Sequence, residues 1–198
     1  MKTILSCILL IMLIGCASTP QFDFHTITYQ KIKKEVLGYG FSKSMNESMA
    51  RNMAETTARK NVAEQLAGMQ FVLTDMNGEQ ELKLSITNVE ISGMSLDKTA
   101  KIEKTGVLIV IVKAEAEIEK PMGEGVLLAE MRTQFSDDLL KISKSRTNVI
   151  QDLINTKFPK AHEVKGTVFI DETDVGWNID TGVIQYYESY LIVIESVI

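Results

Sequence analysis

Cys16 ends a four-residue motif whose residue types point to acylation of a thiol. Leu13, Ile14 and Gly15 come directly before it, at the end of an apolar run over residues 4–14. A basic residue, a short apolar run and small residues at the boundary are the layout of a secretory signal peptide. The run is shorter than the roughly 20 residues that a membrane-spanning helix needs. The motif therefore predicts signal recognition through Leu13, Ile14 and Gly15, followed by cleavage.

The motif resembles the lipobox of bacterial lipoproteins, and this resemblance implies the chemistry at Cys16. In that class the cysteine thiol receives a diacylglyceryl group, the residues before it are removed, and its amine takes a further acyl chain. Residues 1–15 are therefore expected to leave, and Cys16 is expected to join the mature protein to a lipid bilayer. Each buried methylene contributes about 0.8 kcal/mol, so several chains would make the attachment permanent. The alternative is an ordinary secretory signal with an incidental cysteine.

Two features after the cysteine bear on where the protein works. Ala17 stands where an aspartate favours inner-membrane retention in related lipoproteins, which implies the outer membrane of a diderm bacterium. Residues 16–25 are short, polar and contain proline, so they are expected to be a lipidated tether. We expect this tether to hold the folded part at the periplasmic face of the membrane.

The composition argues against several classes of chemistry. Cys7 leaves with the signal and Cys16 is modified, so the mature chain has no thiol for a disulfide, a nucleophile or a metal. The two histidines, His25 and His162, lie apart from any serine motif, metal-ligand pair or glycine elbow. We therefore expect no enzyme activity, no catalytic residue, no cofactor and no metal site. The chain carries 21 basic and 26 acidic residues, which argues against nucleic acid as a partner.

A glycine pair and an alanine row mark the start of the predicted folded body. Gly38 and Gly40 share one face of an extended segment, and glycines two apart let another backbone approach closely. Helix formers and boundary residues predict a helix from Ser44 to Gly68. The small side chains that recur every fourth residue on this helix are Ala50, Ala54 and Ala58. This spacing predicts a helix face that lies flat on a sheet.

A second row on the same helix contains Met45, Met49 and Met53. Thioether sulfurs bind copper(I), so the row offers a soft metal site as one interpretation. No cysteine or histidine accompanies it, and methionine commonly fills irregular gaps in a core. The row is therefore predicted to pack in the core.

Extended segments alternate with turns after the helix. They cover residues 70–75, 81–87, 89–101 and 107–119. The last segment opens with aliphatic residues on both faces, which is typical of a central strand covered on both sides. The first part of the body is therefore predicted to be an antiparallel sheet packed by the alanine-rich helix.

The order of these features resembles the Lpp-twenty lipoprotein family, which is named for a small bacterial outer-membrane lipoprotein. The resemblance is carried by Gly38, Gly40, Ala50, Ala54, Ala58, Arg59, Val62, Ala63, Leu66 and the strand at 106–116. Related domains occur in flagellar assembly protein T and in flagellar basal-disc lipoproteins, where the role is structural and depends on self-association. The resemblance implies such a domain over residues 26–120, with copies of itself or envelope proteins as partners.

The remaining residues, 121–198, are predicted to extend this domain. Apolar side chains at helical spacing predict a second long helix from Gly125 to Phe158, on whose apolar face Arg146 is the only charge. Packing on its own sheet is favoured over a coiled coil, because the mean spacing is near 3.6. Extended segments at 163–172 and 182–196 predict a C-terminal hairpin. A diverged second copy of the first domain is a further hypothesis.

The predicted fold class is therefore α+β, with an antiparallel sheet packed by an alanine-rich helix, then a second long helix and a C-terminal hairpin. Two functions fit this organisation. In the first, the chain is a non-enzymatic, membrane-anchored envelope lipoprotein that acts as a structural or assembly module. In the second, it is a periplasmic ligand-binding module with a pocket near Gly38, Gly40 and an aromatic hairpin. The aromatic residues of that hairpin are Trp177, Tyr186, Tyr187 and Tyr190.

Overall fold

The structure is a computed structural model that describes residues 27–76, 78–86, 91 and 93–198. The predicted signal peptide, the acylation motif at Cys16 and the lipidated tether lie outside these residues. The described elements, in chain order, are β1 (Thr28–Ser42), α2 (Glu47–Ala67), β2 (Met69–Met76), β3 (Glu79–Ile86), β4 (Ser95–Ile102), β5 (Val107–Met122), β6 (Val126–Phe135), α3 (Lys141–Lys157), β7 (Glu163–Trp177) and β8 (Ile184–Val197).

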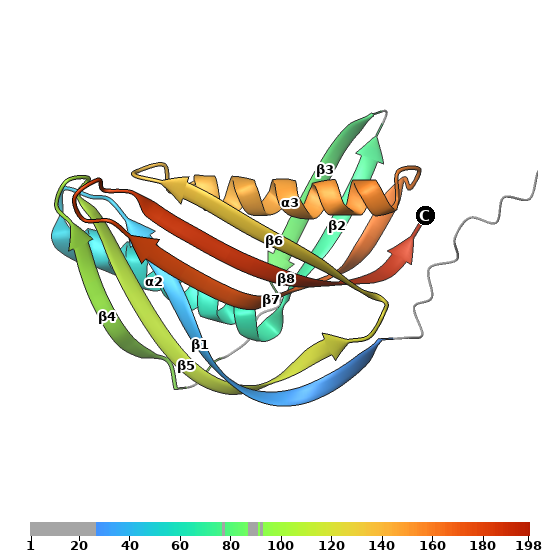
Figure 1. The fold of residues 1–198 in the computed structure, drawn as a ribbon, viewed down its shortest axis with the longest axis horizontal. Helices are drawn as coiled ribbons and strands as arrows, with labels where there is room; N and C mark the ends of the chain where they lie inside the picture. The colour runs from blue at the N-terminus through green and yellow to red at the C-terminus, as the bar shows by residue number, and fades with distance from the viewer. Residues whose placement is uncertain (1–26, 77, 87–90, 92) are drawn as a thin grey trace, which may run out of the picture.

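The fold class predicted from the sequence is wrong. Strands make up 57% of the described residues and form two antiparallel sheets, one of three strands and one of five. Helices contribute only α2 and α3 to this part of the chain. The molecule is therefore mainly β, and the two sheets rather than the helices set its shape (Figure 1).

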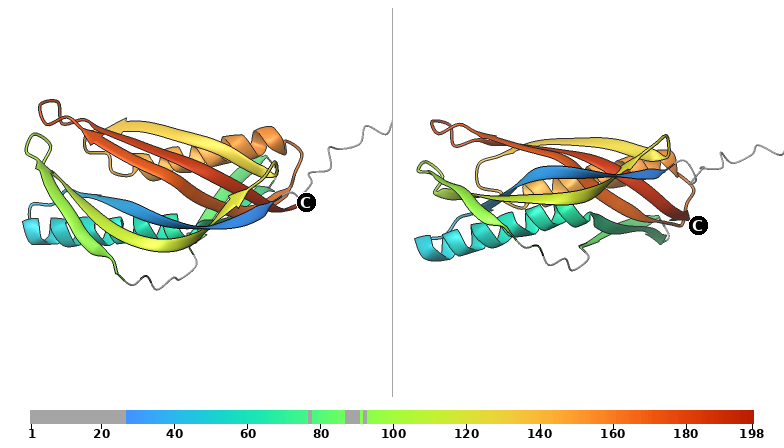
Figure 2. Two further views of the ribbon diagram at one scale, coloured as in Figure 1. Left: turned by 60° about the horizontal axis from the view of Figure 1, so that its bottom comes forward. Right: turned by 90° about the horizontal axis from the view of Figure 1, so that it is seen from below.

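The three-stranded sheet has the order β1-β5-β4. β1 and β5 pair over their whole length, from Thr28 opposite Met122 to Ser42 opposite Leu108. The aliphatic start of β5 is the central strand between β1 and β4. It is buried on both faces because each face of this sheet is covered by another layer. On one face lies α2, and on the other lies part of the five-stranded sheet, as Figure 2 shows.

Local signals explain the bounds of α2. Asn46 caps its N-terminus, because the Asn46 side chain accepts a hydrogen bond from the Met49 amide at 3.0 Å. The helix was expected to begin at Ser44, but the Ser44 hydroxyl instead accepts from the Asn46 amide and belongs to the preceding turn. Gly68 ends the helix with a φ of 71°, a left-handed conformation that glycine adopts without strain.

The five-stranded sheet has the order β3-β2-β7-β8-β6. It joins distant parts of the chain, because β2 pairs with β7 and β6 pairs with β8. This sheet crosses the boundary expected at residue 120. The two halves of the chain also differ in topology, since the first divides its strands between both sheets and the second places β6, β7 and β8 in one.

The predicted helix from Gly125 to Phe158 is the main local error. Its first part forms β6, and α3 begins only at Lys141. The apolar spacing that predicted this helix includes Leu128, but that side chain is 71% exposed, whereas Leu127 is 8% exposed. From Met131 on, alternate residues of β6 are buried, which is the period of a strand. Pairing with β8 thus decides the structure of a segment whose apolar spacing also suits a helix.

One large core lies between the sheets and α3. α3 contributes Ile150 and Ile154, both fully buried, to the face of the five-stranded sheet that also carries Tyr190. The two sheets meet at Phe41 of β1, whose ring packs edge-on against Phe135 at 5.4 Å between ring centroids. A second, smaller core separates α2 from β1 and β5.

Candidate functional site

The glycine pair and the alanine row lie against each other, as the sequence predicted for a close approach. A Cβ atom added at Gly40 would lie 1.7 Å from the carbonyl oxygen of Ala54, and one at Gly38 would lie 2.2 Å from that of Ala58. Ala54 and Ala58 are fully buried, and Ala50 is nearly so. The backbone of α2 therefore fills the space beside the glycines. The ligand pocket expected near Gly38 and Gly40 is not at this position.

The methionine row lies on the opposite side of α2. Met45, Met49 and Met53 have exposed fractions of 108%, 57% and 49%. The interpretation of this row as core packing is therefore wrong. Met49 and Met53 are instead exposed on the surface of α2, and Met45 lies in the turn before it, so the row is an apolar stripe of flexible side chains that adapt to different contacts.

A buried charge cluster joins α2, α3 and β8. We call it the Arg146 cluster, and its members are Arg146, Glu64, Glu188, Tyr186 and Tyr190. Arg146 donates from Nε and Nη2 to the two carboxylate oxygens of Glu188 at 2.9 and 2.6 Å. Its Nη1 donates to Glu64 Oε2 at 2.8 Å. Glu188 is fully buried, so its charge depends on these partners rather than on water.

Two tyrosines complete the coordination of Glu188. The Tyr186 hydroxyl donates to Oε1 at 2.7 Å and the Tyr190 hydroxyl donates to Oε2 at 2.5 Å. Burial raises the pKa of both tyrosines, and the negative charge of Glu188 raises it further. Burial alone would lower the pKa of Arg146, but the two carboxylates outweigh it and hold this pKa well above the usual range. The cluster is thus a charged arginine that bonds to two carboxyl groups, one of which also accepts from two neutral phenols.

Two amides on α2 connect the cluster to β1. Asn61 accepts a hydrogen bond from the Tyr39 amide at 3.1 Å, and its Nδ2 lies 3.5 Å from the Tyr186 hydroxyl. Gln65 donates to the Leu37 carbonyl at 2.7 Å. The two amides and the members of the cluster all have protein partners and are closed off from solvent. The arrangement suits fixing the positions of four elements and offers no free acid, base or nucleophile to a substrate.

Sequence reasoning found Arg146 but missed both of its carboxylate partners. Glu188 was detectable, because it occupies the buried position between Tyr186 and Tyr190 in the alternating pattern of β8. A carboxylate at such a position requires a buried cation. Glu64 carries no comparable signal, since it lies on α2 beside the polar residues Asn61 and Gln65.

A shallow polar groove crosses β6, β8 and β7 on the solvent face of the five-stranded sheet. Arg132, Tyr187 and Asp174 face one another across the three strands, and Gln134, Gln185 and Gly176 form the next row. The groove has a volume of about 620 Å³. The Arg132 guanidinium lies 5.1 Å from the centre of the Tyr187 ring. Such a surface offers an aromatic ring flanked by charged and amide groups.

The four aromatic residues of the predicted hairpin all lie in the described part of the chain. Among them, only Tyr187 is both partly exposed and part of this groove's lining. Tyr186 and Tyr190 are 3% and 1% exposed and belong to the core. The Trp177 ring lies at the end of β7, with the Lys98 ammonium 5.6 Å from its centre. The aromatic hairpin is therefore mainly packing surface, and only its outer row is open.

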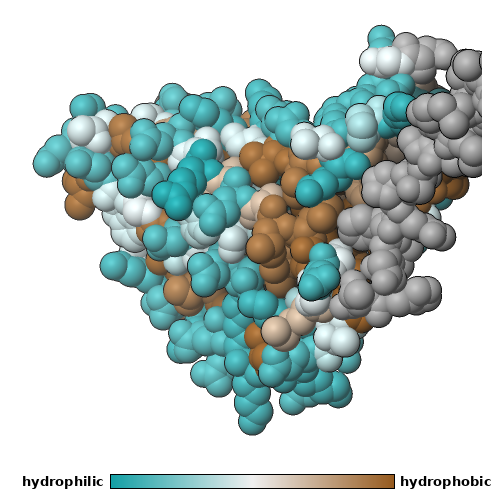
Figure 3. Space-filling view, turned by 45° about the vertical axis from the view of Figure 1, so that its right-hand side comes forward, coloured by the Kyte–Doolittle hydropathy of each residue, from teal (hydrophilic) through white to brown (hydrophobic). Residues whose placement is uncertain are grey.

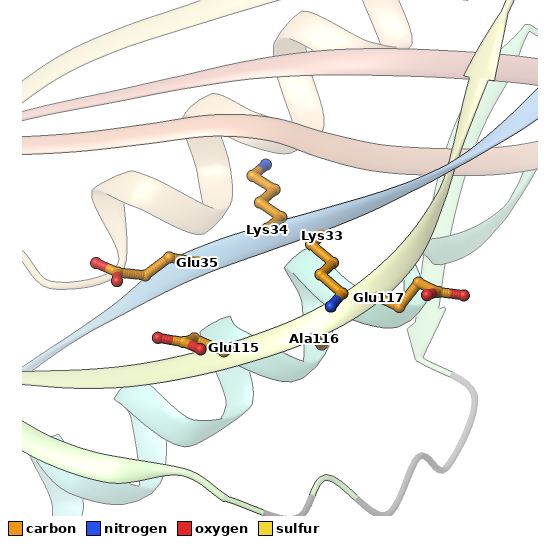
Figure 4. A pocket seen from close by; sticks show the side chains of 6 residues that line it. All are labelled: Lys33, Lys34, Glu35, Glu115, Ala116 and Glu117. Carbon is orange, nitrogen blue, oxygen red and sulfur yellow. The ribbon is translucent and has the colours of Figure 1, made fainter.

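A second groove lies along the middle of β1 and β5 (Figure 4). Its volume is about 440 Å³, and it is lined by Lys33, Lys34, Glu35, Glu115, Ala116 and Glu117. Two of its carboxylates pair with lysines beside the groove, since Lys113 contacts Glu35 and Lys31 lies 3.8 Å from Glu117. The Lys34 ammonium points away and donates to the Asp171 carbonyl. Within the described ranges, no three histidine, cysteine or carboxylate side chains converge on a point where a metal could bind. We interpret this groove as a solvated ladder of charges.

Comparison with protein families, with curated proteins and with solved structures finds no match. The resemblance to the Lpp-twenty family therefore stays a prediction. In the part of the chain that the structure describes, no helix has the length and hydropathy needed to cross a bilayer. Any function assigned to this chain therefore rests on its sequence motif and on its geometry.

Proposed function

We propose that this chain is a lipid-anchored envelope lipoprotein whose folded body is a non-enzymatic assembly module at the outer membrane. The observation that carries the proposal is the motif from Leu13 to Cys16, placed 12 residues before Thr28, where β1 begins. An acyl chain at Cys16 would hold the body on the membrane, and the body would meet its partners there. This proposal includes the structural role that the Lpp-twenty resemblance implies.

Two features of the body support an assembly role. The Arg146 cluster ties α2, α3 and β8 together, and Asn61 and Gln65 extend this network to β1, so the body presents its surface in a fixed arrangement. The groups with strongly shifted pKa values lie inside this cluster and bond to one another, which suits packing rather than catalysis. The methionine row of α2 then offers an adaptable apolar stripe to another protein.

Acylation is tested by growing the host with a labelled fatty acid. We expect label in the membrane fraction and a mature mass that begins at Cys16. Cys16→Ser should lose the label and release a folded body from the membrane, since the core that the structure describes extends from Val36 to Ile194. Cys7→Ser is the matched control and should keep both label and location. A mature chain that starts elsewhere, or that carries no fatty acid, would remove the proposal.

Assembly is tested by crosslinking in intact cells. Acylation uses the thiol of Cys16, so a single new cysteine is the only reactive one. We expect Met49→Cys to form crosslinked species with a thiol-reactive bifunctional reagent. Ile179→Cys, which replaces a side chain of similar exposure in the turn between β7 and β8, should not. Equal or absent crosslinking at both positions would argue against assembly through α2.

Binding of a polar ligand is a second candidate function, favoured by the groove at Arg132, Tyr187 and Asp174. An open aromatic ring beside charged and amide side chains suits a neutral oligosaccharide, whose ring stacks while its hydroxyls form hydrogen bonds. Titration with soluble N-acetylhexosamine oligosaccharides should raise the melting temperature if this candidate holds. Tyr187→Ala should abolish the increase and Tyr29→Ala, on a distant strand, should keep it. No increase in the wild-type protein would exclude this class of ligand.

A further inference from the structure

Exposed apolar side chains gather at one end of the body. We call them the apolar end patch, and its members are Tyr29, Met122, Leu128, Val197 and Ile198. Their exposed fractions range from 38% at Val197 to 71% at Leu128. Figure 3 brings this side of the molecule forward and shows hydrophobic surface in the middle of the view. An apolar surface of this kind on a single chain indicates a contact with something else.

The topology places these five residues at the same end of the body, over an area about 20 Å long, since Leu128 lies opposite Leu191 and Val197 is six residues farther along β8. β1 and β8 supply the ends of their strands, and Met122 lies opposite Thr28 at the last pair of the β1–β5 ladder. A tight turn at Gly123 then leads into β6, where Leu128 lies opposite Leu191. C-terminal Ile198 bonds back to Glu163 at the start of β7. The patch thus lies where β1 begins, β5 ends, β6 begins and β8 ends (Figure 1).

The apolar character continues beneath the exposed side chains. Leu191, which lies opposite Leu128, and Val193 share one face of β8, and they are 8% and 5% exposed. The same face becomes polar farther along the sheet, at Tyr187 and Gln185. One end of this sheet face is therefore mainly apolar and the other polar, and at the apolar end Leu191 also lies beside Ile118 and Pro121 of β5.

The chain before β1 points to the occupant of this patch. Thr28 follows Cys16 by 12 residues, which span at most about 43 Å when fully extended. β1 has 15 residues and leads away from the patch over roughly 46 Å, so the opposite end of the body lies farther from the anchor. The patch is thus the exposed apolar surface at the end where the predicted anchor joins the body.

We infer that the apolar end patch rests on the lipid bilayer, with its side chains at the boundary between headgroups and acyl chains. This inference rests on the proposed lipid anchor. Burial raises the pKa of Tyr29, and the negative charges of Glu195 and Glu119 raise it further. Because an anionic surface repels these two carboxylates, the contact is apolar rather than electrostatic. The body then stands on the membrane by this end and presents the β7–β8 turn away from it.

Tryptophan quenching by brominated lipids tests the position of the patch. Full-length acylated protein is purified and reconstituted into phosphatidylethanolamine–phosphatidylglycerol vesicles whose acyl chains carry bromine. Trp177, the one native tryptophan, is first replaced by phenylalanine, and the later variants are made in this Trp177→Phe background. Leu128→Trp in that background should lose at least half of its fluorescence in brominated vesicles relative to unbrominated ones, and this loss should persist in high salt.

The matched control is Ile179→Trp in the same background. Ile179 is 65% exposed and Leu128 is 71% exposed. Ile179 lies in the turn between β7 and β8, which ends at Ile184. Leu191 and Ile184 are separated by roughly 23 Å along β8, at about 3.3 Å per residue. We expect less than a tenth of the Ile179→Trp fluorescence to be quenched. Melting temperatures of both variants should match that of Trp177→Phe alone.

The outcomes separate this inference from the proposed anchor. An acylated Leu128→Trp variant that is not quenched, or is quenched no more than Ile179→Trp, overturns the inference while the anchor stands. An unquenched Leu128→Trp variant whose emission is shifted to shorter wavelength would assign the patch to a protein contact and would overturn it as well. If mass analysis finds no acyl chains on the protein, the proposed function is overturned instead.

Discussion

The two helices dock onto their sheets in opposite ways. α2 approaches β1 through glycine and alanine, so that backbone atoms nearly touch and the contact is free of charge. α3 approaches the five-stranded sheet through two isoleucines and a buried arginine that pairs with Glu64 and Glu188. The first contact gains from dispersion at short range. The second gains little over an apolar equivalent, but it is satisfied only when α2, α3 and β8 are all in place.

The contact of α2 with β1 depends on shape, whereas the contact of α3 with its sheet depends on charge balance. A contact between small residues tolerates no added volume, whereas a charge cluster tolerates no missing partner. Substitutions that add one atom or remove one charge therefore separate the two.

The largest effect is expected from Arg146→Met. This change leaves Glu188 buried without its cation, which typically costs about 3–5 kcal/mol of unfolding free energy. Chemical denaturation at pH 7 measures the loss. The control is Arg132→Met, which removes an exposed arginine lying 3.6 Å from Glu130 and should cost less than about 1 kcal/mol. Equal costs for the two arginines would show that burial does not matter here.

The double variant Arg146→Met/Glu188→Gln sharpens this result. Glutamine removes the buried charge, and its carbonyl still accepts a hydrogen bond from a tyrosine. We expect the double variant to be more stable than Arg146→Met alone by at least about 1 kcal/mol. If the second substitution adds to the loss instead, the cost of Arg146→Met comes from lost packing rather than from an unpaired charge.

Gly40→Ala is expected to have the next largest effect. The new Cβ would lie 1.7 Å from a backbone oxygen of α2, so the helix must move away from the sheet. Overpacking of this kind costs about 1–3 kcal/mol or more. Gly176→Ala is the matched control in another strand, because its Cβ would meet only the Gln185 side chain at 3.9 Å. Thermal unfolding compares them, and a tie would refute the close-approach explanation.

A smaller effect is expected from pH, through the two buried tyrosines. Their folded-state pKa values are raised above the usual 10.0, so the unfolded chain loses these protons first as pH rises. Their contribution to stability is complete below pH 10 and is lost progressively above it, by about 1.4 kcal/mol per pH unit for each tyrosine. Tyr190→Phe should make the alkaline fall in stability less steep in denaturation series at pH 8 to 11. An unchanged slope would mean that Tyr190 ionises normally in the folded protein.

The smallest effect is expected from Met49→Ser. Met49 lies on the outer side of α2, away from the contact with β1, so stability should change by less than about 0.5 kcal/mol. Ala54→Leu, on the inner side of the same helix, should cost about 1–3 kcal/mol because the added carbons have no space. A large cost at Met49 would show that the methionine row stabilises the body rather than a contact with another protein.

Sequence reasoning predicted the local features of α2 and little of the arrangement around it. The glycine pair and the alanine row are periodic within about 30 residues, so the close contact between β1 and α2 was foreseeable. The pairing of β2 with β7 was not, because the partners are distant in the chain and no pattern connects them. Non-local pairing also determines β6, whose apolar spacing fits a helix when β8 is ignored.

The candidate sites divide in the same way. Arg146 was visible as the single charge on an apolar helix face, but Glu64 and Glu188 lie 82 and 42 residues away from it. The polar groove combines three strands, so its row of Arg132, Tyr187 and Asp174 has no counterpart in the linear sequence. The chemistry of Cys16 is the opposite case, since a motif of adjacent residues needs no tertiary structure to be identified.

The β1–β5 ladder has a mechanical consequence. The anchor would pull on β1 at Thr28, along the strand axis, while a load on β5 at the opposite end of the body, near Leu108, would pull the other way. The hydrogen bonds of an antiparallel pair run perpendicular to the strands, so this load shears all rungs from Thr28–Met122 to Ser42–Leu108 together. A hairpin pulled apart at one end breaks its rungs one after another, at lower force. Under the proposed anchoring, this strand pair would resist tension between the membrane and a bound partner as one unit.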